Sequence, residues 1–473
     1  MDRHGRWIGS VVILVAAIVA ALSARPYAGG WNDGSRLATV ECLVDYHTLA
    51  IDRSIFVQVP PELTPAPYPA DEPDLLQKGT GDKLFIDGHF YSDKSPVPAL
   101  LMASAYQAWQ WITGWTARER PDLFCWVMTL LSSGLSYIVA VGSIYHLGCA
   151  LRLSLTTSLF LTASFALATV ALPYVQHVNN HILLLGVAAQ LFLALTKLAR
   201  NITGGKPVTW LAALSGTLAG LAYTIDLGTG PILLAGTLTL IVFRCRRVVP
   251  VSLFLLSALP CLVLHHAVNY AVGGTFKPAN AVPEYFLWPG CSFNPNNLTG
   301  GWQHPNIGHF LWYAFELLGS KKGFFNHNPS LFLLLPALIL LMRRRLAERP
   351  ELLLAIAWNA GTWLAYATTS NNASGLCCSV RWFVPLLASS YYVLALLLRE
   401  YPRYRADFLL LSGWGLVLAA IMAWHGTWMK HMISLYWPIV AATLLSWAGL
   451  RVWRRRAEVQ VRVPEPAPMA DAA

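Results

Sequence analysis

Apolar residues gather along the chain in blocks that short polar segments separate. Most blocks are about 16 to 25 residues long, the length at which an α-helix crosses a hydrocarbon core of about 30 Å. The clearest blocks are 7–24, 123–147, 156–172, 182–198, 208–223, 231–243, 248–272, 330–342, 352–369, 383–398, 408–423 and 433–450. This pattern predicts an all-α polytopic membrane protein with about twelve transmembrane helices.

Basic residues are concentrated at one end of alternate blocks, in short loops. Loops rich in Lys and Arg stay cytoplasmic, so we expect both termini inside the cell and the long polar loops outside. The segment 96–115 is apolar enough to span, but a span there would turn every later basic cluster outward. Because it carries Tyr106, Trp109, Trp111 and Trp115, which favour the headgroup level, we expect an interfacial helix instead.

Composition agrees with this topology and excludes a soluble domain. Hydrophobic residues make up 55% of the chain and charged residues 12%, whereas a soluble domain carries about a quarter charged residues. The net charge of +10 follows from the cytoplasmic basic loops. It therefore requires no nucleic acid as a partner.

The polar segments divide the chain into four parts. Residues 1–272 form a membrane module that contains a long first outer loop, 25–122. A second large outer loop covers 273–329, and further transmembrane helices cover 330–456. Residues 457–473 combine Pro, Ala and acidic residues, a composition that predicts a disordered cytoplasmic tail.

Candidate chemistry begins in the first outer loop, where Asp33 precedes an amphipathic segment at 35–49 that includes Arg36. Asp33 suits a helix N-cap. It also suits a carboxylate at the membrane surface that accepts a proton or orients a nucleophile. The spacing leaves both interpretations open.

The same loop contains Asp87-Gly88 between apolar residues, which predicts a tight hairpin turn. The second arm and its exit carry further candidates for substrate binding, namely His89, Tyr91, Asp93 and Lys94. Lys94 stands just before the interfacial helix, at headgroup height. Its ammonium group could contact lipid phosphate generally or the phosphate of a specific lipid substrate.

A second polar cluster lies at the outer end of the block that begins at 182. Polar groups close to the membrane are costly and tend to be functional, which makes His177, Asn180 and His181 candidates. Two His four residues apart could hold a metal, contact phosphate or sugar, or cap the helix. No cofactor is indicated with certainty, and a divalent metal stays open.

Three later residues complete the set of candidates. The guanidinium fork of Arg381 suits a phosphate group. Lys322 has the alternative of a solvated surface residue, and Glu284 that of a hydrogen bond within its own loop.

The order of these features resembles the GT-C superfamily of polytopic membrane glycosyltransferases. That group includes protein O-mannosyltransferases, lipid A aminoarabinose transferases and bacterial lipopolysaccharide sugar transferases. The resemblance rests on the first-loop carboxylate, on Lys94-Ser95-Pro96 opening an aromatic helix, and on Tyr174-x-Gln176, and it extends to about residue 200. It implies sugar transfer from a polyprenyl-phosphate donor to a glycan, lipid or protein acceptor, at the outer face of a prokaryotic inner (plasma) membrane.

The resemblance also implies roles for single residues. Asp33 matches the carboxylate that activates the acceptor, and Lys94 matches the lysine that contacts the donor phosphate. Two positions depart from the family's pattern: Gly34 stands where Glu is frequent, and His181 where Asp is frequent. A transporter or flippase is one alternative, although nearly charge-free blocks without internal repeats disfavour it. A non-catalytic scaffold is the other.

Overall fold

Helices form nearly all of the regular secondary structure in the computed structural model, which describes residues 3–293, 298, 300–429 and 431–462. Strands β1 (Lys83–Ile86) and β2 (His89–Ser92) make one antiparallel hairpin. Its turn residues Asp87 and Gly88 have φ of 51° and 87°, as a tight turn requires. The predicted all-α class and the predicted hairpin are both confirmed.

Every apolar block contributes to a helix. The α-helices are α1 (Arg3–Ser23), α2 (Trp31–Asp45), α3 (Pro73–Lys78), α4 (Pro96–Thr113), α5 (Pro121–Thr129), α6 (Leu135–Ala150), α7 (Leu155–Leu167), α8 (Ala171–Tyr174), α9 (Asn180–Thr203), α10 (Thr209–Ile225), α11 (Gly230–Cys245), α12 (Val248–Gly273), α13 (Ile307–Gly319), α14 (Phe324–His327), α15 (Leu334–Met342), α16 (Arg349–Thr369), α17 (Leu386–Glu400), α18 (Arg405–His425) and α19 (Tyr436–Arg462). A π-helical turn, Leu130–Gly134, joins α5 to α6, and the 3-10 turn η5 (Arg381–Phe383) precedes α17.

Four helical stretches are both long and apolar enough to cross a membrane. They are Pro121–Ala150, Asn180–Thr203, Val248–Gly273 and Pro402–His425. A fifth is added if Ile307–His327 and Pro329–Met342, bent by 109° at their junction, form one broken span. Several other apolar helices are shorter, so the count of twelve spans stays a prediction. Helix α13 was not predicted, because its residues fall in the segment read as the second outer loop.

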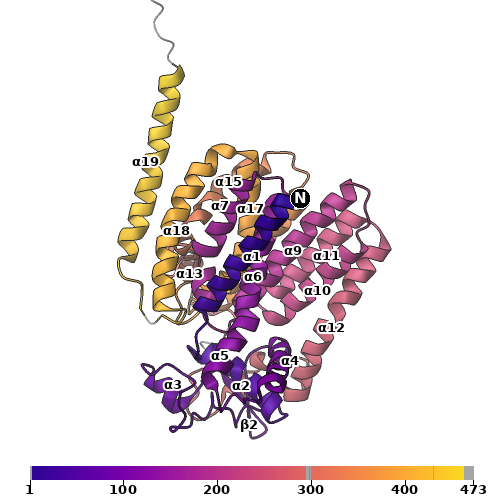
Figure 1. The fold of residues 1–473 in the computed structure, drawn as a ribbon, viewed down its shortest axis with the longest axis vertical. Helices are drawn as coiled ribbons and strands as arrows, with labels where there is room; N and C mark the ends of the chain where they lie inside the picture. Colours follow the sequence, from indigo (N-terminus) through magenta and orange to yellow (C-terminus); the bar gives the residue numbers. More distant parts are fainter. Residues whose placement is uncertain (1–2, 294–297, 299, 430, 463–473) are drawn as a thin grey trace, which may run out of the picture.

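The long helices run side by side in a bundle, and residues 25–122, here called the cap, cover one end of it (Figure 1). Helix α17 is buried along nearly its whole length at the centre of the bundle. The cap has a core of its own that includes Leu37, Val40, Phe56 and Tyr106. Helix α1 begins and α19 ends at the bundle end opposite the cap (Figure 1).

Helix α4 belongs to the cap and lies outside the bundle (Figure 1). One side packs against α2, where Tyr106 is fully buried and donates a hydrogen bond to Asp45. The other side presents Trp111, which is 80% exposed. Such a helix, buried on one face and aromatic on the other, suits a membrane interface.

Candidate functional site

A cavity of about 580 Å³ lies where the cap meets the bundle. Because neighbouring helices run in opposite directions, α9 starts at this level while α10, α12 and α16 end there. The cavity is lined by polar residues from the cap, from these four helix ends and from η5: Asn32, Arg36, Asp82, Tyr91, Asp93, Lys94, Asn180, His181, Asp226, His265, Asn269, Tyr366 and Arg381.

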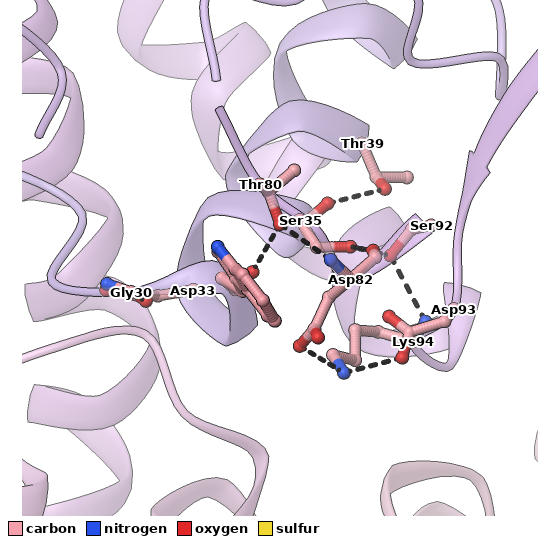
Figure 2. A network of polar contacts seen from close by, with 10 residues as sticks. Gly30, Asp33, Ser35, Thr39, Thr80, Asp82, Ser92, Asp93 and Lys94 are labelled. Carbon is pink, nitrogen blue, oxygen red and sulfur yellow. Dashed lines mark hydrogen bonds and ion pairs between the residues drawn. The ribbon is translucent and has the colours of Figure 1, made fainter. Parts of the chain in front are cut away.

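Lys94 is held between two carboxylates on the cap side of the cavity. Its Nζ lies 2.6 Å from Asp82 and 2.7 Å from Asp93, as Figure 2 shows. Burial raises the pKa of Asp93, and the charge of Lys94 opposes this shift. Ser35 ties α2 to the cluster, since its hydroxyl donates to the Asp82 carbonyl at 2.6 Å and lies 2.6 Å from the Ser92 hydroxyl. Lys94 is therefore fixed in position and its charge is largely compensated.

Two arginines at the cavity have guanidinium nitrogens that no described residue satisfies. Arg36 is 3% exposed, and its Nε and Nη1 are buried without a hydrogen-bond partner. Nε of Arg381 is also buried without a hydrogen-bond partner. Burial lowers the pKa of Arg36 to about 10, against the opposing carboxylates of Asp93 and Asp82. A buried cation without a partner is costly. The pair is therefore poised for an anionic ligand.

Asp226 anchors the bundle side of the cavity. Its Oδ1 accepts hydrogen bonds from the Tyr366 hydroxyl and the Gly228 amide, each at 2.9 Å. Its Oδ2 lies 3.3 Å from His181 Nδ1, an ion-pair distance without hydrogen-bond geometry. Burial alone would raise the pKa of Asp226, but His181 and Tyr366 outweigh it and lower the pKa. Asp226 is therefore ionised at neutral pH.

Asp33 does not line the cavity. Gly30 is the N-cap of α2, and Asp33 occupies the third helical position. Its carboxylate accepts hydrogen bonds from the amides of Gly29 at 2.6 Å and Gly30 at 2.9 Å, and His177 Nδ1 lies 3.3 Å away. Figure 2 shows Asp33 beside Gly30 and apart from the Lys94 cluster. The predicted N-cap is displaced by three residues, because the helix starts earlier than the amphipathic pattern.

Seven of the predicted site residues converge on the cavity: Arg36, Tyr91, Asp93, Lys94, Asn180, His181 and Arg381. The others lie elsewhere. His89 is mostly exposed and lies 3.1 Å from Asp52, and Glu284 is exposed. Lys322 donates to the Gly375 carbonyl, and His177 faces Asp33.

Six of the polar lining residues named above were not predicted as site residues: Asn32, Asp82, Asp226, His265, Asn269 and Tyr366. Asp226 carried a usable signal, since a carboxylate at the end of an apolar block is rare and tends to be functional. Asp82 carried none, because its partner Lys94 lies across the hairpin. His177 and His181 precede and open α9 and face different carboxylates, so they do not form the considered metal pair. No group of three or more His, Cys, Asp or Glu suited to a metal ion occurs among the described residues.

No family model matches the sequence, and no curated protein matches it. Solved structures do match the fold. ArnT from Cupriavidus metallidurans bound to undecaprenyl phosphate superposes with a TM-score of 0.51 at 14% identity, over 95% of this chain and 72% of ArnT. The apo form of ArnT from the same organism superposes with a TM-score of 0.51 at 14% identity, over 96% of this chain and 73% of ArnT.

The Archaeoglobus fulgidus oligosaccharyltransferase is more distant, with a TM-score of 0.46 at 12% identity, over 94% of this chain and 56% of its own. ArnT is a GT-C glycosyltransferase, and the chain therefore has the polytopic GT-C fold.

Proposed function

We propose that this protein is a membrane glycosyltransferase that moves a sugar from a polyprenyl-phosphate donor to an acceptor at the outer face of the plasma membrane. The observation that carries the proposal is the pair of arginines at one cavity, buried Arg36 and half-buried Arg381, whose guanidinium groups include buried nitrogens without hydrogen-bond partners. A phosphate group supplies the acceptors that their guanidinium nitrogens lack, in charge-assisted hydrogen bonds. A polyprenyl carrier is favoured because ArnT, which shares the fold, was solved with undecaprenyl phosphate.

Transfer breaks the bond between the sugar's anomeric carbon and a phosphate oxygen, so negative charge grows on the departing phosphate. Fixed cations in a site that excludes water stabilise this charge most effectively. Arg36 and Arg381 supply that charge directly. Lys94, compensated by Asp82 and Asp93, adds a fixed donor at the cavity and joins the two ends of the hairpin.

The test measures binding and transfer with protein in lipid nanodiscs. We expect Arg36→Gln and Arg381→Gln each to weaken binding of undecaprenyl phosphate at least about tenfold, a loss of about 1.4 kcal/mol. Each should also abolish most transfer of label from a radiolabelled polyprenyl-phosphate hexose to cell-envelope acceptors.

Arg118→Gln is the matched control, because Arg118 is a cap arginine that is 56% exposed and lies 3.8 Å from Glu62. It should bind the lipid as the parent does. Binding by both cavity variants at the parent's affinity would overturn the assignment of the phosphate site. Binding without any transfer by the parent protein would favour a lipid transporter or a scaffold.

A further inference from the structure

Two buried Asp–His pairs flank the start of α9, and they differ in their relation to the cavity. Asp33 pairs with His177, and Asp226 pairs with His181, each at 3.3 Å between Nδ1 and Oδ2. Both oxygens of Asp33 already accept backbone amides, and neither member of that pair lines the cavity. Both members of the second pair line it.

The second pair is held on both sides. Tyr366 and the Gly228 amide fix Oδ1 of Asp226, while Oδ2 faces the imidazole and accepts a long hydrogen bond from the Asn180 side chain at 3.5 Å. The Tyr366 ring is stacked on Trp382, with centroids 4.3 Å apart and planes 4° apart. The His181 amide donates to the Asn179 side chain at 2.8 Å, which fixes the first turn of α9. The carboxylate and the imidazole therefore have little freedom to move apart.

This arrangement leaves one basic nitrogen unused. Nδ1 of His181 faces Asp226, and Nε2 has no hydrogen-bond partner among the residues that the structure describes. A carboxylate on one imidazole nitrogen selects the tautomer whose other nitrogen accepts a proton, and it stabilises the imidazolium that results. In structures without substrate such contacts are often longer than in the reacting complex.

We propose that His181 is the catalytic base of the transfer, that Asp226 positions it, and that the acceptor is therefore a neutral hydroxyl rather than a phosphate. The proposal rests on the proposed function above. As the acceptor oxygen bonds to the anomeric carbon, its proton passes to Nε2 of His181. The bond from that carbon to the phosphate oxygen breaks, and polyprenyl phosphate leaves with the electron pair. Charge and atoms balance without any co-reactant.

The other carboxylates of the site serve this step less well. Asp82 and Asp93 share the Lys94 ammonium, which competes for their lone pairs. An anionic acceptor would need no base, and the negative charge of Asp226 behind His181 would repel it. The remaining charged or titratable groups that face His181 are Arg36 of α2, Arg381 of η5 and Tyr366 of α16.

The first experiment compares transfer rates in nanodiscs as a function of pH, with cell-envelope acceptors and a radiolabelled polyprenyl-phosphate hexose. We expect His181→Gln to lower kcat by about 10²- to 10⁴-fold, the usual contribution of a general base, with unchanged binding of undecaprenyl phosphate. The parent's rate should rise with pH as the imidazole loses its proton. The pH–rate profile of the variant should lack this rising limb. Asp226→Asn should lower kcat more than it changes KM. It should also shift the rising limb of the pH–rate profile to a different pH.

His425→Gln is the control, since His425 is exposed at the end of α18, and it should match the parent. Loss of the pH limb in Asp33→Asn but not in His181→Gln would transfer the role to Asp33 and overturn the proposal while leaving a transferase. No transfer by the folded parent protein would overturn the proposed function itself, and the base assignment with it.

The second experiment identifies the acceptor class from the product bond. A sugar joined to a hydroxyl survives mild acid, whereas a sugar joined to phosphate is released. We expect the transferred label to stay bound after mild acid treatment. Release of the label would show a phosphate acceptor and would overturn the proposal even if His181 affects the rate.

Discussion

At the scale of single residues, Gly34 is explained by a side chain from elsewhere in the cap. A Cβ at this position would overlap the hydroxyl of Tyr68. Tyr68 is buried, donates to the Phe56 carbonyl at 2.8 Å and packs edge-on against the Phe56 ring. The GT-C pattern often has Glu at this position, and here Tyr68 fills the space that a side chain would need.

Glu41 gives a prediction of pH-dependent stability. It is fully buried in α2, where it accepts hydrogen bonds from the Ser54 hydroxyl at 2.5 Å and the Ile55 amide at 3.1 Å. Burial raises its pKa from 4.5 to about 8. The folded protein thus keeps a proton that the unfolded chain releases, so this stabilisation is complete below pH 4.5 and is lost as pH rises through about 8.

We expect Glu41→Gln to be more stable than the parent above pH 8, by at least about 1 kcal/mol in the free energy of unfolding. The difference should shrink toward zero or reverse near pH 4.5, because the amide retains an acceptor for Ile55. Thermal unfolding of both proteins across this pH range makes the comparison. A difference that does not vary with pH would contradict the assignment to this carboxyl.

The basic residues at the cavity could be predicted from the sequence, whereas the residues that position the site around them could not. Arg36, Lys94, His181 and Arg381 could be identified because a polar side chain near the membrane is rare enough to be informative. Asp82 and Tyr366 have ordinary local surroundings. Only the fold brings Tyr366 to Asp226, 140 positions away in sequence, so no local pattern contains that contact.

At the scale of elements, α10 and α12 pack closely through glycine. A Cβ at Gly216 would overlap the Phe254 carbonyl, and one at Gly220 would overlap the Ala258 carbonyl. Small residues one turn apart allow helix backbones to approach in this way. Since Asp226 directly follows α10, this packing also sets the position of the carboxylate that faces His181.

We expect Gly216→Val to destabilise the protein by about 1–3 kcal/mol, because overpacking at a backbone contact cannot be relieved by a rotamer change. It should also reduce transfer activity, as the end of α10 is displaced. Gly413→Val is the control, since a Cβ at Gly413 on α18 meets open space. Thermal unfolding in detergent measures both. Equal melting temperatures for the two variants would show that α10 and α12 can move apart at this contact without loss of stability.

Elements with strong local signals were predictable from sequence. The Asp87-Gly88 turn needs positive φ at both positions, and few other dipeptides supply it. Helix α4 was identified by its aromatic residues and by the charge rule. Helix α13 escaped prediction because its 13 residues are too few to span, and a bend of 109° separates Ile307–His327 from Pro329–Met342.

At the scale of the whole molecule, the structure gives the predicted topology a concrete form. The start of α1 and the end of α19 lie at the end of the bundle opposite the cap (Figure 1). The partly buried ion pairs Arg244–Glu351 and Arg399–Glu348 join neighbouring helices at the basic clusters predicted to be cytoplasmic. The sidedness of the membrane stays a prediction from those clusters, because the fold would be equally compact in either orientation.

A labelling experiment checks the sidedness. In a background without accessible cysteines, we expect Lys78→Cys in the cap to react with a membrane-impermeant maleimide on intact cells. Arg345→Cys should react only after permeabilisation. Both positions are exposed, Lys78 with 71% of its side chain accessible. Labelling of Arg345→Cys on intact cells would mean that the protein is inserted the other way.

The clamp on Lys94 has a consequence for turnover. Of the three cations at the cavity, Lys94 is matched by Asp82 and Asp93, which leaves Arg36 and Arg381 to meet the phosphate. Loss of its sugar turns a carrier phosphodiester into a monoester with more negative charge, so an uncompensated basic pocket would hold the spent carrier more tightly than the fresh one. Compensation of the third cation, Lys94, weakens that preference. We therefore expect the spent carrier to leave readily and to inhibit little, which keeps it available for reloading.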